Sequence, residues 1–376
     1  MKDTMGIILA ENPEIRLNEL TDIRSVAALP FAGRYRLIDF ILSNMVNSGI
    51  INVGVTTLFN YSSLMDHVGN GNAWDLNRKT YGLFFLPPYI RGGDMGLGIG
   101  PNGGNVDLLY SVMTHLRRSR QSYVLISGGN LVFNTTFEEL LNFHKETEAD
   151  LTVVYHRLAN NPEQLSRTTV YEINDDGRVT GIEHNPKSPK TCYSGMGIYI
   201  VERTRLISMI EEAHAKGNHD FIRDVLLGNL KNLNIYAYEY KGFVGRVDSI
   251  KSYYDNSMLM LDDDIRRQLF GGENLIFTKV KDQVPTRYGA NSAVSDSLIA
   301  DGCHIDGQVE NSIIFRGVNI GKGTVVRNSI IMQNTVINEN CDLENVVIDK
   351  ECTLRPNKRL IGQPNYPVIL PKRTMI

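Results

Sequence analysis

The chain has 376 residues, of which 42% are hydrophobic and 22% are charged. This length is too great for one ordinary hydrophobic core and indicates two domains. The formal net charge of -3 creates no overall field that would attract nucleic acid or an acidic membrane, so it argues against a basic DNA-binding protein and against a disordered acidic tail.

The cysteines and the apolar runs bear on the cellular compartment. The cysteines form no C-x-x-C pair and have no histidine cluster beside them, so we expect reduced, mostly buried thiols. These residues are Cys192, Cys303, Cys341 and Cys352. The apolar run 6–10 is too short for a secretory signal, and no run reaches the length of a membrane helix. We therefore expect a cytoplasmic protein.

Short β-branched runs alternate with longer amphipathic stretches over roughly the first 240 residues. This alternation predicts a mainly parallel sheet that is covered on both faces. Ligands of such sheets lie beyond the carboxyl ends of the strands, so we expect a site in the loops after Ala10, Thr57 and Ser127. The expected strands are 6–10, 51–57, 123–127 and 150–155, and the expected helices are 36–48, 107–116 and 137–148.

Two segments interrupt this alternation. Residues 69–105 are rich in Gly, Asn and Pro and predict a long irregular loop over the edge of the sheet. Loops of this length are often functional lids or disordered insertions. Residues 253–270 predict one helix that connects to the last part of the chain.

From about Val294 the sequence follows a six-residue cycle in which one aliphatic residue is separated from the next by small or polar residues. This period is typical of a hexapeptide β-helix, with an aliphatic ladder from Ile299 to Leu354. The alternative is a small antiparallel β domain, which the repeated spacing disfavours. Residues 364–376 are expected to be a non-repetitive cap or tail. The six-residue spacings join Ile299 to Ile305, Ile314 to Ile320, Ile331 to Ile337, and Ile337 to Leu343.

Segments spread over most of the chain carry a resemblance to a known family: Ile8 to Ala10, Arg16 and Leu17, Leu20 and Thr21, Arg24, Pro30 to Phe40, Leu42 to Asn44, Asn47 to Ile50, Glu183 to Pro186, Ser194 to Tyr199, His219 to Phe221, Asp248 and Ser249, and Ser252 to Tyr254. With these segments the chain resembles bacterial ADP-glucose pyrophosphorylases, which are glucose-1-phosphate adenylyltransferases. The resemblance implies an α/β fold: a Rossmann-like, GT-A-like nucleotidyltransferase domain with a mainly parallel mixed sheet, then a left-handed parallel β-helix. The implied boundaries are 1–255 for the first domain, 256–290 for a linking helix and connector, and 291–376 for the β-helix.

The phosphate-binding loop departs from the family pattern Gly-Gly-x-Gly-x-Arg-Leu. Glycines there let backbone N–H groups approach a triphosphate closely. A proline in this loop removes one N–H donor, and two glutamates add negative charge where phosphates would lie. Val26 also replaces the family's lysine, which would meet the polyphosphate. The loop before Arg16 reads Glu11, Asn12, Pro13, Glu14 and Ile15.

Three further positions depart from what the resemblance implies for metal and sugar phosphate. Asn130 and Arg246 stand where the family has the two aspartates that bind Mg²⁺, and Asn185 replaces the lysine that binds the sugar phosphate. A hard divalent cation needs anionic oxygens, which an amide replaces poorly and a guanidinium does not replace at all. We therefore expect no catalytic residue, metal or cofactor in this chain, and Mg²⁺ only in a catalytic partner.

The chain matches the family in its scaffold segments but departs from it at the phosphate and metal positions. In this combination it resembles the GlgD-type regulatory subunits of bacterial ADP-glucose pyrophosphorylase. The resemblance implies a hetero-oligomer, expected to be a tetramer, with the catalytic paralogue, whose activity it raises, and self-association is also open. Three alternatives remain: an active adenylyltransferase, a pseudoenzyme that senses a nucleotide or sugar phosphate, and an acyltransferase for which His304 is the candidate catalytic histidine. Residual phosphate or effector contacts are expected from Arg24, Arg34 and Arg36, although these arginines could instead pair with acidic neighbours such as Asp39.

Overall fold

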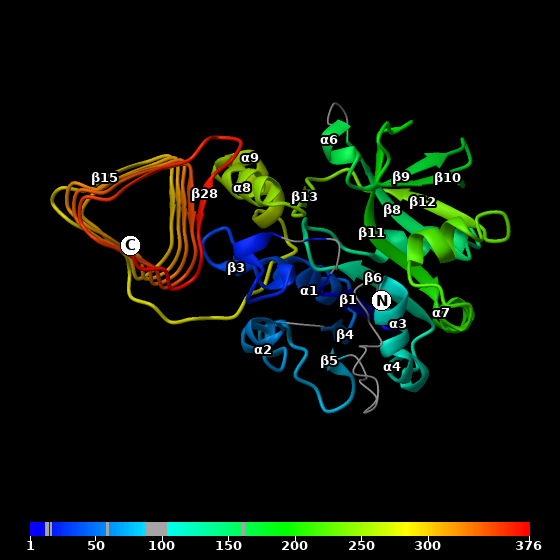
Figure 1. Cartoon of the computed structure of the whole chain (residues 1–376). Helices are drawn as coiled ribbons and strands as arrows, with labels where there is room; N and C mark the ends of the chain where they lie inside the picture. The colour runs from blue at the N-terminus through cyan, green and yellow to red at the C-terminus, as the bar shows by residue number, and fades with distance from the viewer. Residues whose placement is uncertain (12–14, 16, 58–59, 88–103, 159–161) are drawn as a thin grey trace. The chain divides into compact units, whose positions relative to one another are not determined.

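The structure is a computed structural model that describes residues 1–11, 15, 17–57, 60–87, 104–158 and 162–376 (Figure 1). It divides into two compact units that do not follow chain order. No helix in these ranges is both long and apolar enough to cross a membrane. The first unit comprises residues 1–14, 41–59 and 69–244, and the second comprises residues 15–40, 60–68 and 245–376.

The first unit is an α/β structure built on a nine-stranded sheet among its described residues. Its strands are β1 (Thr4–Leu9), β4 (Asn52–Thr56), β5 (Gly82–Leu86), β6 (Tyr123–Gly128), β8 (Leu151–Arg157), β9 (Thr169–Ile173), β10 (Val179–His184), β11 (Tyr193–Glu202) and β12 (Ile235–Glu239), with the short β7 (Leu131–Val132) outside the sheet. Its helices are α3 (Asn105–Ser111), α4 (Met113–Arg118), α5 (Glu138–Glu146), α6 (Pro162–Leu165), α7 (Arg203–Ala215) and the π-helix η4 (Phe221–Leu227), and the turn η3 is Asn72–Trp74. Helix α1 (Leu37–Asn47) contains the boundary between the units.

The sheet order is β10-β9-β11-β6-β1-β4-β5, with β8 on β11 and β12 on β8. Strands β6, β1, β4 and β5 run parallel, whereas β11 is antiparallel to β6 and β8. The prediction of a mainly parallel mixed sheet is therefore confirmed. Because Leu9 of β1 pairs with Gly128 of β6, the loops after these two strands leave the sheet at the same edge.

The two faces of β1 are covered by different helices, as the side-chain alternation of a strand requires. Met5 and Ile7 are fully buried in a cluster with residues of α3, α4 and α7. On the opposite face, a Cβ at Gly6 would lie 2.5 Å from the sulfur of Met45 in α1. Gly6 therefore allows α1 to approach the sheet closely.

Two predictions for the first unit were partly wrong. The expected helix 107–116 is interrupted at Val112, whose N–H bonds the carbonyls of Leu109 and Tyr110, so the backbone tightens locally and α4 starts anew. The expected loop 69–105 contains β5, which pairs in parallel with β4 at the sheet edge. Residues 88–103 of that segment lie outside the described part.

The second unit contains the β-helix, which Figure 1 shows as stacked coils of triangular cross-section. Each side is a parallel five-stranded sheet, and fully buried aliphatic residues such as Ile320, Ile337 and Leu354 fill the interior. The hexapeptide prediction is confirmed. The sheets are β14 (Arg287–Tyr288), β17 (His304–Ile305), β20 (Asn319–Ile320), β23 (Val336–Ile337) and β26 (Thr353–Leu354); β15 (Ala293–Ser295), β18 (Gln308–Glu310), β21 (Val325–Arg327), β24 (Asp342–Glu344) and β27 (Arg359–Ile361); and β16 (Leu298–Ile299), β19 (Ile313–Ile314), β22 (Ile330–Ile331), β25 (Val346–Ile348) and β28 (Val368–Leu370).

The limits of the repeat differ from the prediction at both ends. The first strand, β14, precedes Val294, where the aliphatic cycle becomes visible in the sequence. The expected tail contributes β28, which pairs with β25, and Ile376 bonds back to Thr353. Tertiary pairing recruits these segments although their sequences lack the period.

Short helices and strands make up the rest of the second unit, and Tyr253 of α8 bonds the segment at Pro30. Tyr253 is fully buried, and its hydroxyl donates to the carbonyl of Pro30 at 2.7 Å. The expected single helix 253–270 is wrong, because Asp262 adopts an extended conformation and caps a new helix with its carboxylate. The elements are η1 (Asn18–Leu20), η2 (Val26–Ala28), β2 (Pro30–Phe31), β3 (Tyr35–Arg36), α2 (Ser62–Val68), β13 (Gly245–Arg246), α8 (Ile250–Met258), η5 (Leu259–Leu261) and α9 (Asp263–Phe270).

Candidate functional site

In the first unit, the sheet edge formed by β1 and β6 is where the phosphate loop and the first metal position were expected. The N–H of Gly129 donates to the carbonyl of Leu9 at 3.1 Å, which joins the two strand ends. Glu11 is half-buried just beyond β1. The expected loop residues Asn12, Pro13, Glu14 and Arg16 lie outside the described residues.

Asn130 follows β6 at this edge and is half-buried. Its amide oxygen lies 2.9 Å from the place that a Cβ would occupy at Gly128, so the side chain folds back over the strand end. The group at this position is therefore a neutral amide. Among the described residues no cluster of three or more His, Cys, Asp or Glu side chains could hold a metal ion. Asn130 does not fit Mg²⁺, which binds proteins through carboxylates.

Asn185, the expected sugar-phosphate position, directly follows β10 and adopts a left-handed conformation with φ +50°. Asparagine tolerates this conformation better than most residues, so the local backbone favours it here. Its amide Nδ2 donates to Nε2 of His184 at 3.2 Å, and the other ring nitrogen of His184 bonds the hydroxyl of Thr169 at 3.1 Å. Asn185 thus supports a turn and carries no charge for a phosphate.

Two further expected positions, Val26 and Arg246, belong to the second unit. Val26 opens the turn η2 and is buried, with its carbonyl accepting from the N–H of Leu29 at 3.0 Å. Arg246 is half-buried in β13, and its carbonyl accepts from Nδ2 of Asn256 at 2.8 Å. The apolar side chain of Val26 carries no charge for a polyphosphate, and the guanidinium of Arg246 does not bind a divalent cation.

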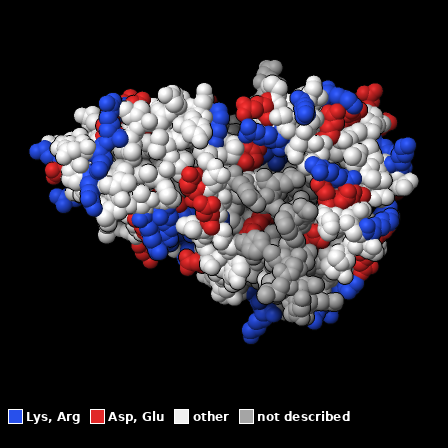
Figure 2. Space-filling model, in the orientation of Figure 1, with Lys and Arg blue, Asp and Glu red and all other residues white. Residues whose placement is uncertain are grey.

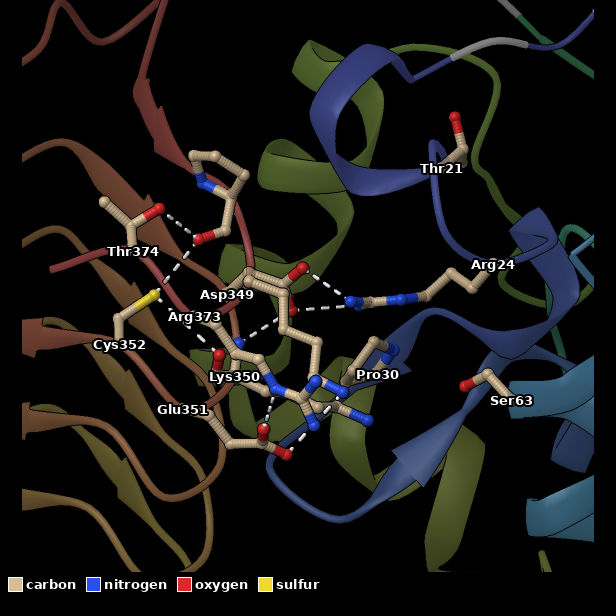
Figure 3. Close-up of polar contacts among 12 residues, drawn as sticks. Thr21, Arg24, Pro30, Ser63, Asp349, Lys350, Glu351, Cys352, Arg373 and Thr374 are labelled. Atoms are coloured by element: carbon tan, nitrogen blue, oxygen red, sulfur yellow. Dashed lines mark hydrogen bonds and ion pairs between the residues drawn. The ribbon is translucent and has the colours of Figure 1, made fainter.

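Of the three arginines expected to contact phosphate, Arg24 is committed to a buried ion pair. Its guanidinium donates to both carboxylate oxygens of Asp349, at 3.0 and 2.5 Å, and both side chains are almost completely buried (Figure 3). This bidentate pair joins residues 325 positions apart and anchors the segment before Pro30 to the β-helix. Arg24 does not line the cavity described next.

Arg34 and Arg36 line a cavity of about 650 Å³ that lies within the second unit. This volume is within the range of small-molecule sites. Basic side chains outnumber acidic ones in its wall, and Figure 2 shows Lys and Arg gathered over the β-helix. The basic residues are Arg34, Arg36, Lys279, Lys281, Arg316, Lys350, Lys372 and Arg373, and the acidic ones are Asp66 and Glu351.

The wall of the cavity is built from buried polar groups. Arg36 donates to the carbonyl and hydroxyl oxygens of Ser63, at 2.5 and 2.9 Å, and burial lowers its pKa to about 10. Nε2 of His67 lies 2.6 Å from the buried carboxylate of Asp39, and burial lowers the pKa of His67 despite this partner. Arg316 is only 6% exposed, and its Nε has no hydrogen-bond partner among the described residues.

Sequence reasoning named Arg34 and Arg36 but missed the β-helix side of this cavity. The sequence contains a pattern that could have predicted it. A long polar side chain lies two positions after the end of each of the strands β19, β22, β25 and β28. The register stacks these residues in one column, since β19 pairs with β22, β22 with β25, and β25 with β28. The column consists of Arg316, Gln333, Lys350 and Lys372.

Comparison with known proteins agrees with this architecture. The profile of the family described as nucleotidyl transferase matches residues 5–262, and a profile described as GlmU-like, C-terminal hexapeptide matches residues 282–365. The chain belongs to the nucleotidyl transferase family. The predicted fold class of a nucleotidyltransferase domain followed by a hexapeptide β-helix is therefore confirmed.

The similar proteins fall into two groups. The chain is 39% identical to the glycogen biosynthesis protein GlgD of Geobacillus stearothermophilus and 36% identical to that of Bacillus subtilis (strain 168), over 86% of this chain and 82% of each relative. It is 35% identical to a glucose-1-phosphate adenylyltransferase of Clostridium beijerinckii, over 87% of this chain and 84% of that protein. The resemblance to the GlgD and adenylyltransferase group is confirmed.

Proposed function

We propose that this chain is a non-catalytic regulatory subunit that assembles with a catalytic glucose-1-phosphate adenylyltransferase in glycogen biosynthesis and raises its activity. The observation that carries the proposal is the neutral amide of Asn130 at the end of β6, where nucleotidyl transfer would need a metal-binding carboxylate. Similarity to proteins named GlgD supports the same role.

Nucleotidyl transfer depends on neutralising phosphate charge and on positioning the reactants. The described positions work against both requirements. Asn130 offers no anionic ligand, Asn185 offers no cation, and Arg246 places a positive charge where a metal ligand is needed. The scaffold is nevertheless kept, including the sheet, the β-helix and the Arg24–Asp349 anchor. A regulatory subunit needs the scaffold and can act by favouring the active conformation of its partner.

The decisive experiment compares the purified chain, the catalytic paralogue and their co-expressed mixture. ADP-glucose formation from ATP, glucose 1-phosphate and Mg²⁺ is measured for each, together with particle mass. We expect no turnover by the chain alone, a larger particle in the mixture, and higher activity than the paralogue shows alone. Turnover by the chain alone would establish the rival function of an active adenylyltransferase. Failure to associate or to change the paralogue's kinetics would refute the regulatory role.

A second candidate function, compatible with the first, is ligand sensing through the cavity of the second unit. The observation that favours it is the cluster of eight basic side chains around one cavity: Arg34, Arg36, Lys279, Lys281, Arg316, Lys350, Lys372 and Arg373. Such a wall suits a phosphorylated metabolite or a nucleotide, because phosphate oxygens accept bonds from several cations at once.

Calorimetric titration of the purified chain with nucleotides and sugar phosphates tests this candidate. We expect binding that is lost in Arg316→Met, because Arg316 is a buried cavity cation with an unused donor. Lys322→Met is the matched control, since Lys322 is exposed and lies outside the cavity wall. Equal binding by both variants would place the ligand elsewhere.

A further inference from the structure

A separate cavity of about 370 Å³ lies in the first unit, at the β5 edge of the nine-stranded sheet. Residues of β5, of the turn between α3 and α4, and of α4 line it, and none of them lines the cavity of the second unit. Gly54 of β4 makes room for two of the lining side chains, because a Cβ there would lie 2.5 Å from Cδ1 of Leu86 and 3.4 Å from Cδ2 of His115. The volume is within the range of small-molecule sites.

Asn52 gives this cavity a hydrogen-bond acceptor of fixed orientation. Its side chain is 1% exposed, and its Nδ2 donates to Oγ of Ser119 at 3.1 Å and to Oε1 of Gln121 at 3.0 Å. Because Oγ of Ser119 donates in turn to the carbonyl of His115 at 2.8 Å, it must accept from Asn52, which fixes the amide nitrogen on this side. The amide oxygen is buried without a hydrogen-bond partner among the described residues. A buried acceptor in this state destabilises the fold, and a ligand that donates to it removes this cost.

His115 and Phe84 form a pair of rings in the wall of the same cavity. Their ring centroids are 4.9 Å apart and their planes are tilted by 51°. Nε2 of His115 is buried and has no partner in the described part of the chain. Burial lowers the pKa of His115, so the imidazole is neutral near pH 7. Phe84 is 40% exposed, so its ring can turn away from the imidazole and admit another flat ring beside it.

Arg118 of α4 supplies the charge of this cavity. Its side chain is exposed, and within the described ranges it has no ion-pair partner. No carboxylate of the described residues lines the cavity, and much of the remaining wall is apolar, as at Leu86, Pro87 and Val112. An apolar wall with one free cation and neutral acceptors suits an organic anion that has an aromatic body and one N–H or O–H donor.

We propose that this cavity binds a small aromatic carboxylate whose ring carries an N–H or O–H donor. The carboxylate pairs with Arg118, the ring packs against His115 in place of Phe84, and the donor reaches the amide oxygen of Asn52. A flat bicyclic molecule of the size of an indole is small enough for the volume of about 370 Å³. This site is independent of the regulatory role and of ligand sensing in the second unit, because it uses other residues in the other unit.

Saturation-transfer NMR titrations of the full chain with three related probes test the proposal. Indole-3-acetate has the ring, the N–H donor and the carboxylate, whereas naphthalene-1-acetate lacks the donor and tryptophol lacks the carboxylate. We expect a Kd of about 0.1–1 mM for indole-3-acetate. Each of the other two probes is expected to bind about tenfold more weakly. Equal affinity for all three probes, or no binding of indole-3-acetate at about 10 mM, overturns the proposal.

Arginine variants locate the bound carboxylate. Arg118→Met is expected to weaken the binding of indole-3-acetate about tenfold, and the fold tolerates this change because the side chain is exposed. Arg120→Met is the matched control, since Arg120 is exposed and lies outside the cavity wall, and it is expected to bind as the wild type does. Arg316→Met, in the cavity of the second unit, is expected to do the same. Equal losses in Arg118→Met and Arg120→Met, or a loss in Arg316→Met, would overturn the proposal and leave the regulatory role untouched.

Discussion

Substitution of Asp349 by Asn isolates the energy of the buried anchor to Arg24. The side chains are 2% and 0% exposed, and two charge-assisted bonds join them at 3.0 and 2.5 Å. Asp349→Asn keeps the shape but leaves the guanidinium buried without a countercharge. Breaking a buried pair in this way costs about 3–5 kcal/mol. For a unit of this size we expect the melting temperature to fall by about 10 °C, measured by calorimetry.

The matched control is Asp342→Asn, which removes one side of the Arg327–Asp342 pair on the β-helix. Both of those side chains are 35% exposed, so we expect a loss of about 1 kcal/mol or less. The double variant Arg24→Met with Asp349→Leu is expected to recover most of the stability lost in Asp349→Asn, because it removes both charges. Equally small falls in melting temperature for Asp349→Asn and Asp342→Asn would show that the Arg24–Asp349 pair does not stabilise the fold.

Three further predictions concern stability. Burial lowers the pKa of Lys350 to about 6 in the folded chain, whereas its ordinary value in the unfolded chain is 10.5. Between these two pH values the unfolded chain binds one more proton than the folded chain, so the free energy of unfolding rises with pH. Lys350→Met is therefore expected to stabilise the chain by up to about 4 kcal/mol at pH 7.5, and urea titrations should show this gain vanish toward pH 10.5. Tyr253→Phe leaves the carbonyl of Pro30 without its donor and is expected to cost about 1–3 kcal/mol in the same assay, whereas no loss would place a water on that carbonyl. Gly6→Ala places a methyl group 2.5 Å from the sulfur of Met45 and is expected to cost about 1–3 kcal/mol, with recovery in the double variant Gly6→Ala with Met45→Ala; a neutral Gly6→Ala would show that α1 can shift.

Periodicity in the sequence was sufficient for most of the first unit and for the β-helix. The expected strand 6–10 is β1, the expected helix 36–48 is α1, and the ladder from Ile299 to Leu354 fills the β-helix interior. These predictions succeeded because the repeat of a backbone conformation imposes the repeat of its buried positions. They failed where a single local interaction breaks a regular pattern, as at Val112 and at the cap residue Asp262.

The candidate site residues could also be predicted from the sequence only in part. The sequence by itself determined that Glu11, Asn130, Asn185 and Arg246 carry an acid, two amides and a guanidinium, because charge is a property of the residue type. That these residues stand where the family has glycine, carboxylate and lysine stays a prediction from the resemblance. Only the tertiary structure decided what the arginines do. Arg24 is paired with Asp349, 325 residues away, whereas Arg36 lines a cavity with Lys350. The physical reason is that the partner of each arginine depends on the register of the β-helix coils and on how distant segments pack together. No local sequence pattern encodes that register or that packing.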